Sequence, residues 1–209
     1  MHYSFPINFV YWQSVHNHKQ IKSTLLKQIL SKKDLTESKK PNGWKCEINT
    51  SFEMGYEFNE FLLDSQYINN IIWNPIDSML DEFNPHINQP KSSFITNAWY
   101  NIYTEDSKDQ YQEIHDHLSS SIVENGKEYF ASYSAIYILH NSKKENSTVF
   151  FSSGPHTGKD PLSNIYFDTS EYDTIGEGSV LIFPAHLKHY VKPCFDNRVT
   201  ISYNIYSEL

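Results

Sequence analysis

The sequence is poor in several features that mark common protein classes. Of its 209 residues only Cys46 and Cys194 are cysteines, and neither belongs to a CxxC motif, so we expect two reduced thiols and no disulfide framework. Nowhere do about 18 apolar residues run together, as a membrane-spanning helix requires. The start, Met1 to Gln13, also lacks the basic segment and apolar run of a signal peptide. These absences predict a cytoplasmic protein with no membrane partner.

Positive charge is scarce as well. Lys and Arg together number 17 against 25 Asp and Glu, which gives a formal net charge of −8. Because a protein that binds the nucleic-acid backbone needs a clustered excess of Lys and Arg, we expect no nucleic-acid partner. The chain shows no internal repeat, and its length suits a single domain over residues 1–209. A homodimer is compatible with this composition.

Aromatic residues are plentiful, with 15 Tyr and 13 Phe, and they favour β structure. From about residue 91 onward, short aromatic and β-branched runs alternate with turn signals, which is typical of antiparallel strands. Strands of the expected number and length suit a jelly roll, whose two packed sheets leave a mouth where side chains converge. The expected strands are 93–104, 110–118, 129–140, 147–152, 163–168, 178–184, 187–193 and 197–206.

Residues 1–90 show helical periodicity instead. Apolar residues recur at helical spacing over about 16–31, and again from 68 to 83 after a possible cap at Ser65. Pro75 must kink this second stripe or begin a new helix within it. We expect the helices to pack on the outside of the sheet, as a support for a jelly-roll core at 91–209. The predicted fold class is therefore α+β.

Two histidines lie close together on one predicted strand. His115 and His117 are two residues apart, so on a strand their side chains point to the same face, whereas Asp116 points to the opposite face. Two imidazoles on one face can reach a single metal ion. Glu113 would share this face, and a bulge would instead turn Asp116 inward. The alternative is a surface strand on which the sequence His115-Asp116-His117 occurs by chance.

A second pair of histidines follows the predicted strand 178–184. His189 begins the next strand, which in a jelly roll runs near the first, so we expect it to join His115 and His117 around one ion. His186 lies in the intervening turn and is expected to be exposed or to support a ligand. Three imidazoles, or two and a carboxylate, leave positions open for substrate and oxygen, as in non-haem iron(II) oxygenases.

Arg198 is a candidate for binding an anion. Thr200 and Ser202 follow it at two-residue steps and share its face of the last predicted strand. An inward arginine is costly unless it is paired, and a guanidinium with a hydroxyl makes a bidentate seat for a carboxylate. The alternative is an arginine at the rim that pairs with Asp196 or Glu208.

At these positions the sequence resembles the 2-oxoglutarate- and iron(II)-dependent oxygenases of marine bacteria and their phages, which are similar to prolyl hydroxylases. The resemblance covers about 93–206 and implies a double-stranded β-helix. It implies iron(II) held by His115 and His189 and 2-oxoglutarate held by Arg198. The segments that carry it are 97–103 (NAWYNIY), 112–117 (QEIHDH), 134–139 (SAIYIL), 178–184 (GSVLIFP), 189–193 (HYVKP) and 198–204 (RVTISYN).

The chain departs from the wider superfamily at one position. The wider superfamily has His-x-Asp or His-x-Glu, whereas this chain has His115-Asp116-His117. The marine bacterial and phage members that this chain resembles also look like His-x-His at this position. A neutral third ligand leaves the iron one unit more positive, which should alter its oxygen chemistry. We take His117 as the third ligand, while Asp116, Glu113 or a water remain alternatives.

The resemblance implies a dioxygenase that hydroxylates an unidentified small-molecule or peptide substrate. It would use O₂ and convert 2-oxoglutarate to succinate, with the far carboxylate of this cosubstrate against Arg198 and a hydroxyl of Thr200 or Ser202. We also assign Asn101 to the cosubstrate pocket. Other candidate lining residues are Trp99, Tyr133, Tyr137 and Asn204, and the loop 153–163 is a candidate to close over the mouth.

Two other hypotheses compete with a 2-oxoglutarate-dependent dioxygenase. A cupin shares the β architecture and often uses three histidines and a glutamate, for which Glu124 would be the fourth ligand, but it has no use for Arg198. A non-catalytic β-sandwich that binds a sugar or a protein also suits the aromatic, acidic composition. Such a non-catalytic protein would bind no iron(II).

Overall fold

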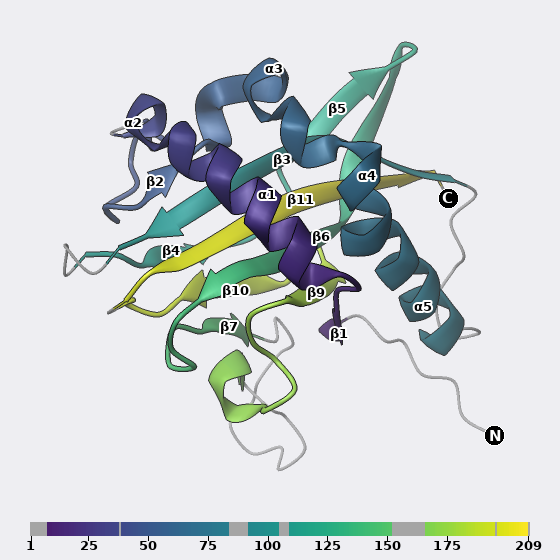
Figure 1. Ribbon diagram of the computed structural model, residues 1–209. Coiled ribbons are helices and arrows are strands. Elements are labelled where there is room, and N and C mark those ends of the chain that lie inside the picture. Colours follow the sequence, from purple (N-terminus) through teal and green to yellow (C-terminus); the bar gives the residue numbers. More distant parts are fainter. Residues whose placement is uncertain are drawn as a thin grey trace, which may run out of the picture.

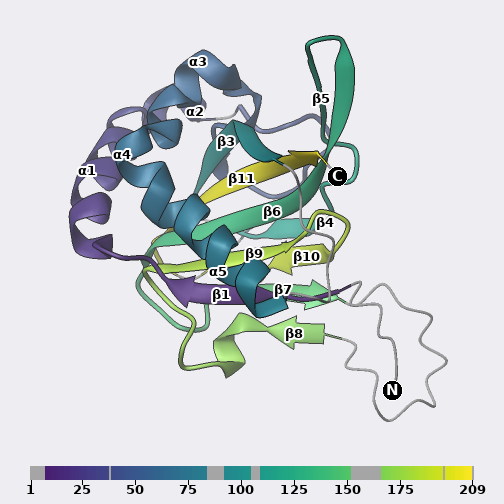
Figure 2. The ribbon, with the colours of Figure 1, turned by 90° about the vertical axis from the view of Figure 1, so that its right-hand side faces the viewer.

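The computed structural model describes residues 8–37, 39–83, 92–104, 109–151, 166–194 and 196–208. In these residues two antiparallel sheets pack with a layer of helices (Figures 1 and 2). The larger sheet has the strand order β1-β9-β6-β11-β3-β2, with β5 paired to β6, and the smaller sheet has the order β4-β10-β7-β8. No described helix combines the length and apolar character needed to cross a bilayer.

The strands are β1 Tyr11–Ser14, β2 Asn49–Thr50, β3 Ser92–Tyr103, β4 Gln112–His115, β5 Ser121–Glu124, β6 Lys127–Asn141, β7 Thr148–Phe151, β8 Tyr166–Asp168, β9 Ser179–Pro184, β10 Lys188–Val191 and β11 Arg198–Glu208. The α-helices are α1 His18–Ser31, α2 Lys33–Thr36, α3 Gly55–Asn59, α4 Ser65–Ile68 and α5 Asn74–Phe83. Short 3-10 turns lie at η1 Phe52–Met54, η2 Glu60–Leu63 and η4 Thr169–Glu171, and η3 Asn69–Trp73 is a π-helical turn.

The predicted combination of mostly antiparallel sheet with helices is confirmed, and two antiparallel sheets are consistent with the expected jelly roll. Three strands were missed. The hairpin of β5 and β6 turns at Asn125-Gly126, where both residues have positive φ, which is a typical two-residue hairpin turn. The short strands β1 and β2 join the larger sheet from within residues 1–90. The division of the domain at about residue 90 remains a prediction.

The second predicted helical stripe is a nearly continuous helix, α4-η3-α5. Its cap is Asp64 and not Ser65, because the Asp64 carboxylate accepts the N–H of Gln66 at 2.8 Å. Pro75 does not break this helix. The π-helical turn immediately precedes it, at the point where the missing proline N–H would interrupt the α-helical ladder.

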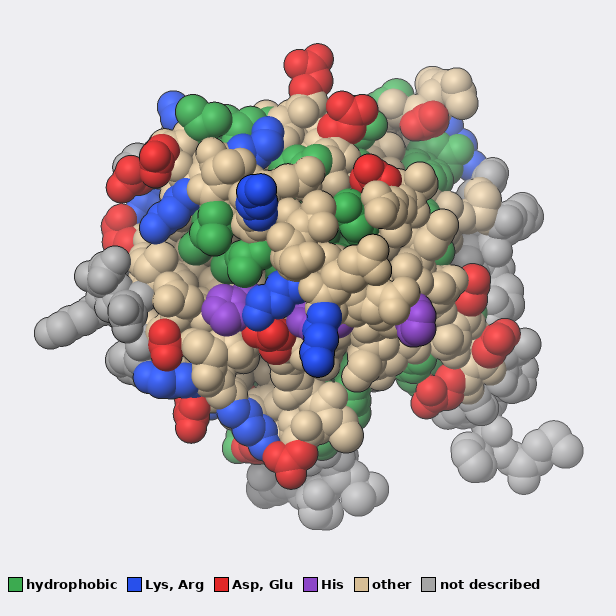
Figure 3. All heavy atoms as spheres, in the orientation of Figure 1, with side chains coloured by type: hydrophobic (Ala, Val, Ile, Leu, Met, Phe, Trp, Pro, Cys, Tyr) green, Lys and Arg blue, Asp and Glu red, His purple; other side chains and the backbone are tan. Residues whose placement is uncertain are grey.

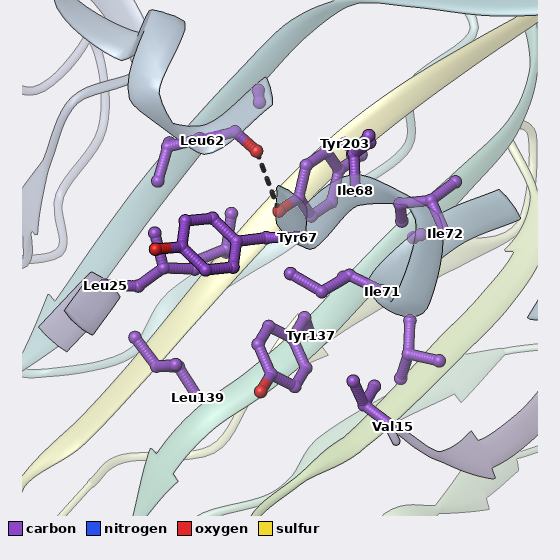
Figure 4. Packing of buried hydrophobic residues seen from close by; sticks show 14 of the residues in the cluster. Val15, Leu25, Leu62, Tyr67, Ile68, Ile71, Ile72, Tyr137, Leu139 and Tyr203 are labelled. Atoms are coloured by element: carbon purple, nitrogen blue, oxygen red, sulfur yellow. Dashed lines mark hydrogen bonds between the residues drawn. The ribbon is translucent and has the colours of Figure 1, made fainter. Parts of the chain in front are cut away.

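The larger sheet is buried on both faces, so alternate residues of each strand meet different surroundings. On β11, Val199, Ile201 and Tyr203 pack with the helices in one apolar cluster. Figure 4 shows this cluster, in which the Tyr203 hydroxyl donates to the Leu62 carbonyl at 3.4 Å. The residues between them, beginning with Arg198, face the smaller sheet. In Figure 2 the helices α1, α4 and α5 lie along one side of the larger sheet.

The space between the two sheets is apolar in one half and polar in the other. On the β9–β6 side, buried apolar side chains fill it, among them Ile136, Phe150 and Phe183. On the β11–β3 side, hydroxyl, amide and guanidinium groups line a narrow cavity. The apolar half stabilises the packing of the sheets, and the polar half holds the candidate site.

Helix α1 is also tied to the sheet by charge. Glu177 accepts from the Lys22 ammonium at 2.6 Å, from the Asn141 main-chain N–H at 3.0 Å, and pairs with His140 at 2.8 Å. Burial raises the pKa of this carboxyl, but these donors outweigh burial and lower the pKa to about 2. Figure 3 shows basic, acidic and histidine side chains side by side in the middle of this face.

Gly178, which precedes β9, gives the first testable prediction. It has φ +90°, and a Cβ there would lie 2.9 Å from Cγ of His18. Gly126 has φ +76° with no atom within 4 Å of a built Cβ. Both alanine variants meet left-handed backbone strain of about 1–2 kcal/mol, but only Gly178→Ala adds a clash. We expect urea denaturation to show a larger decrease in the free energy of unfolding for Gly178→Ala than for Gly126→Ala. Equal decreases would contradict the clash.

Candidate metal centre and anion pocket

The pairing of β10 with β4 brings two histidines together. His189 lies directly opposite His115 in this antiparallel pair, and their ring centroids are 4.2 Å apart. His117 completes the group with ring centroids 5.3 Å from each of the other two. One nitrogen from each ring lies within 4.8 Å of the others, so a single metal ion can contact all three. The predicted group of His115, His117 and His189 is therefore present.

The reason that His117 joins this group differs from the predicted one. Strand β4 ends at His115, so strand alternation does not orient His117. Instead the main-chain N–H of His117 donates to the Ala185 carbonyl at 2.8 Å, which anchors the chain after β4 to the turn after β9. This tertiary contact holds the main chain at His117 against the turn after β9.

Each imidazole uses its Nδ1 in a hydrogen bond to an oxygen that can only accept. His115 Nδ1 lies 2.7 Å from the Glu113 carbonyl, and His189 Nδ1 lies 3.1 Å from the Leu187 carbonyl. His117 Nδ1 lies 2.8 Å from the side-chain oxygen of Asn204. Each Nδ1 must therefore carry the proton, which leaves the Nε2 lone pair free. This is the tautomer that a metal-binding histidine needs.

Burial keeps these imidazoles neutral. It lowers the pKa of His115, and together with the neighbouring His115 imidazole it lowers the pKa of His117 to about 4. The same causes lower the pKa of His189, which is only 2% exposed, well below its ordinary value. Neutral imidazoles can bind a metal at neutral pH without first losing a proton.

Neither nearby carboxylate belongs to the group. Glu113 accepts the main-chain N–H groups of Lys45 and Cys46, and Asp116 accepts the N–H of Leu118 at 3.2 Å. Glu124, the fourth ligand expected for a cupin, lies exposed on strand β5 and is not part of the group. The described residues therefore offer a metal three neutral ligands and no carboxylate.

His186 also lies outside the group. Its Nε2 is 3.0 Å from the Asn8 side-chain oxygen.

Arg198 is the only arginine in the sequence, and it is fully buried. Its Nη2 donates to the Thr148 hydroxyl at 2.8 Å, while Nε and Nη1 have no hydrogen-bond partner among the described residues. The guanidinium also lies over the Tyr103 ring, 5.7 Å from its centroid. The alternative in which Arg198 lies at the rim and pairs with Asp196 is wrong, because Arg198 is buried and Asp196 pairs with Lys143 at 3.6 Å. The side chain of Glu208 lies outside the described residues.

The imidazole group and the guanidinium line the same narrow cavity. The predicted Asn101, Thr200 and Ser202 line it as well, together with Trp99. The other lining residues lie on β3, β4, β6, β7 and β10 and meet only when the two sheets pack, so no sequence pattern assigned them to the cavity. These are Tyr103, Gln112, Ile136, Thr148 and Val191. The candidate loop 153–163 lies outside the described residues.

Two predicted lining residues lie elsewhere. Tyr133 and Tyr137 face the helices, because both occupy the opposite alternation of β6, and the Tyr137 hydroxyl is 2.7 Å from Nδ1 of His18. Asn204, which was also predicted to line the pocket, hydrogen-bonds to Nδ1 of His117 and so contacts the metal group directly.

These residues fit an iron(II) ion and a dicarboxylate. Three free Nε2 atoms supply the borderline nitrogen ligands that suit first-row divalent metals. A buried cation whose Nε and Nη1 have no described partner requires an anion, because an uncompensated buried charge is costly. Among the described lining residues none is Asp or Glu, so these walls offer Arg198 no carboxylate.

The lowered histidine pKa values predict how stability depends on pH. An imidazole of the unfolded chain titrates near 6.5, whereas His117 titrates at about 4 in the fold. As pH falls from 6.5 toward 4, the unfolded state binds more protons, so the free energy of unfolding of the metal-free protein should fall by about 1.4 kcal/mol per pH unit for each such imidazole. Above pH 6.5 this contribution is fully present.

Urea unfolding at several pH values measures this slope. We expect the His117→Gln variant to lose less stability over the same range than the natural chain, since it lacks one buried imidazole and the effect of that imidazole on His189. Identical slopes would show that His117 is not buried as a neutral imidazole.

No family model matches the sequence, and no curated protein matches it. Solved structures match the fold. A prolyl-4-hydroxylase from Pseudomonas putida matches with a TM-score of 0.55 and 8% identity, over 98% of this chain and 95% of that chain. HygX from Streptomyces hygroscopicus, with nickel, 2-oxoglutarate and hygromycin B bound, matches with a TM-score of 0.55 and 16% identity, over 98% and 84%.

The viral collagen prolyl hydroxylase of Paramecium Bursaria Chlorella virus-1, in complex with 2-oxoglutarate, matches with a TM-score of 0.52 and 9% identity, over 95% of this chain and 97% of that chain. At such identities the likeness concerns the fold, and an origin in marine bacteria or phages remains a prediction. The chain has the fold of prolyl-hydroxylase-like 2-oxoglutarate oxygenases.

Proposed function

We propose that the protein is a 2-oxoglutarate- and iron(II)-dependent dioxygenase that hydroxylates a small-molecule or peptide substrate and converts 2-oxoglutarate to succinate. One observation carries this proposal: three imidazoles with free Nε2 atoms and a buried, incompletely partnered guanidinium line one cavity. The similar structures named above support it, since some of them contain 2-oxoglutarate and nickel. In this proposal the two sheets form a double-stranded β-helix.

Seven residues of the cavity would hold the metal and the cosubstrate in this proposal. His115, His117 and His189 would bind iron(II) through Nε2, and Arg198 would bind the far carboxylate of 2-oxoglutarate. Thr200, Ser202 and Asn101 lie on the same wall of the cavity and would add hydroxyl and amide groups to the carboxylate site. When bound, iron with 2-oxoglutarate supplies the oxidising power for the O₂-dependent hydroxylation.

The protein's own contribution is placement and exclusion of water. Trp99, Ile136 and Val191 line the cavity with apolar surface and are 3%, 7% and 4% exposed. A dry cavity strengthens the attraction between Arg198 and a carboxylate, because few water molecules screen it. Arg198 keeps its charge at any working pH, so the seat is available throughout the physiological range.

The first test of this function is succinate release. Protein supplied with iron(II), O₂ and 2-oxoglutarate should release succinate. Arg198→Met should weaken 2-oxoglutarate binding about 30-fold or more, since removing one partner of a buried charged pair costs at least about 2 kcal/mol. Lys192→Met is a matched control, because this cation pairs with Asp168 and does not line the cavity.

The outcomes separate the competing functions. Metal binding without any affinity for 2-oxoglutarate would favour a cupin-type metalloenzyme. A protein that binds no iron(II) under anaerobic conditions would favour a non-catalytic binding protein. Equal 2-oxoglutarate binding by the Arg198→Met and Lys192→Met variants would remove Arg198 from the proposal.

The charges in the cavity also predict that metal and cosubstrate bind cooperatively. The described walls of the cavity contain no carboxylate, so a bound divalent metal and Arg198 would have no counter-charge from these walls. The two negative charges of 2-oxoglutarate would compensate the metal and Arg198. We expect saturating 2-oxoglutarate to lower the dissociation constant of Co²⁺ by about 5- to 150-fold, the usual range of site-to-site coupling. Titration calorimetry in both orders of addition measures this, and linkage requires the same factor in each order. An unchanged dissociation constant would contradict the charge argument.

A further inference from the structure

The three imidazoles differ in what holds their Nδ1 atoms. His115 and His189 each donate to a main-chain carbonyl two residues earlier, which any sequence would provide. His117 Nδ1 instead meets the side chain of Asn204, which lies 87 residues away on β11. The orientation of the third imidazole therefore depends on one particular side chain.

Asn204 is itself held in place from several sides. Its oxygen also accepts from the Ser134 hydroxyl at 3.1 Å, and its amide nitrogen donates to the Ser120 hydroxyl at 2.8 Å. Ser120 in turn is 2.9 Å from the Tyr206 hydroxyl. Asn204 is 2% exposed, so water does not compete for these bonds. Its oxygen is fixed toward His117 by a network that joins β6, β11 and the turn after His117.

Two other rings lie nearly parallel to the His117 ring. Trp99 stacks with it at a centroid distance of 5.6 Å and an angle of 24° between planes, and His189 stacks with 5.3 Å and 14°. Such flat aromatic neighbours suit a planar ring. The Asn204 oxygen meets this ring at Nδ1, so its Nε2 has no part in that hydrogen bond.

A carboxylate at position 117 would fit these surroundings poorly. It offers the Asn204 oxygen no N–H, so two acceptors would face each other. The hydrogen bond to Asn204 therefore suits histidine at position 117, although the superfamily pattern that begins at His115 would have a carboxylate there.

We propose that Asn204 is the positioning residue of the third metal ligand, and that it makes position 117 a site for a neutral imidazole. The centre then binds its divalent metal through three neutral protein ligands. This inference rests on the proposed function, because it takes the three histidines as metal ligands. Asn204 acts through His117 and does not itself contact the metal.

The test measures Co²⁺ binding under conditions in which no turnover occurs. We expect Asn204→Ala to weaken Co²⁺ binding about 10- to 100-fold, the usual loss when a hydrogen-bond partner of a ligand is removed. Asn204→Asp keeps an oxygen for His117 and should restore binding to within a few-fold of the natural chain. Asn59→Ala is the matched control: Asn59 is 3% exposed, and among the described residues its side chain bonds to the main chain of Ser51 and Gly55.

A second arm exchanges the ligand itself. We expect His117→Asp to bind Co²⁺ more weakly than the natural chain, even though it recreates a His-x-Asp pattern. Binding as tight as that of the natural chain would overturn the inference. So would Asn204→Ala binding that matches the Asn59→Ala control.

A readout in the metal-free protein keeps this inference separate from the proposed function. Long-range ¹H–¹⁵N correlation spectra report which nitrogen of His117 carries the proton. We expect the Nδ1–H tautomer in the natural chain and in Asn204→Asp, and a mixture in Asn204→Ala. A natural chain that keeps this tautomer but binds no Co²⁺ would refute the proposed metal site while supporting the role of Asn204 in orienting His117. An unchanged tautomer in Asn204→Ala would refute that role.

Discussion

The burial of both faces of the larger sheet is the constraint on which the rest of the structure depends. Each of its central strands must present one row of side chains to the helices and another to the smaller sheet. On β11 these rows are apolar and polar, respectively, because the helices exclude water while the cavity offers hydrogen-bond partners. A shift of register by one residue would exchange the two rows and place Arg198 among apolar side chains.

Charge is the second constraint. The described walls of the cavity hold one guanidinium, three neutral imidazoles and several neutral polar groups, but no carboxylate. Here Glu113 and Asp116 are close in sequence, yet their oxygens bind main-chain N–H groups. In the proposed function a bound dicarboxylate supplies the negative charge, and this links its binding to that of the metal.

Local pattern in the sequence was sufficient for several features. Two-residue alternation located the strands that carry Arg198, Thr200 and Ser202, and helical periodicity located α1 and the helix that ends at Phe83. The same alternation misplaced Tyr137, because a strand buried on both faces is apolar in both rows and gives no sign of which row faces the cavity. The cap at Asp64 and the hairpin at Asn125-Gly126 are local signals that a closer inspection of the sequence would have detected.

The sequence by itself determined which residue types were available: histidines at two-residue spacing, a third histidine at the start of a later strand, and a single arginine. Only the tertiary structure decided that these groups meet. The register between β4 and β10 sets His189 opposite His115, and the contact with Ala185 holds the main chain at His117 against the turn after β9. Asn204 then fixes the tautomer of His117 across 87 residues of chain. Strand pairing and hydrogen bonds between distant residues leave no periodic trace in a sequence, and so only the folded chain reveals them.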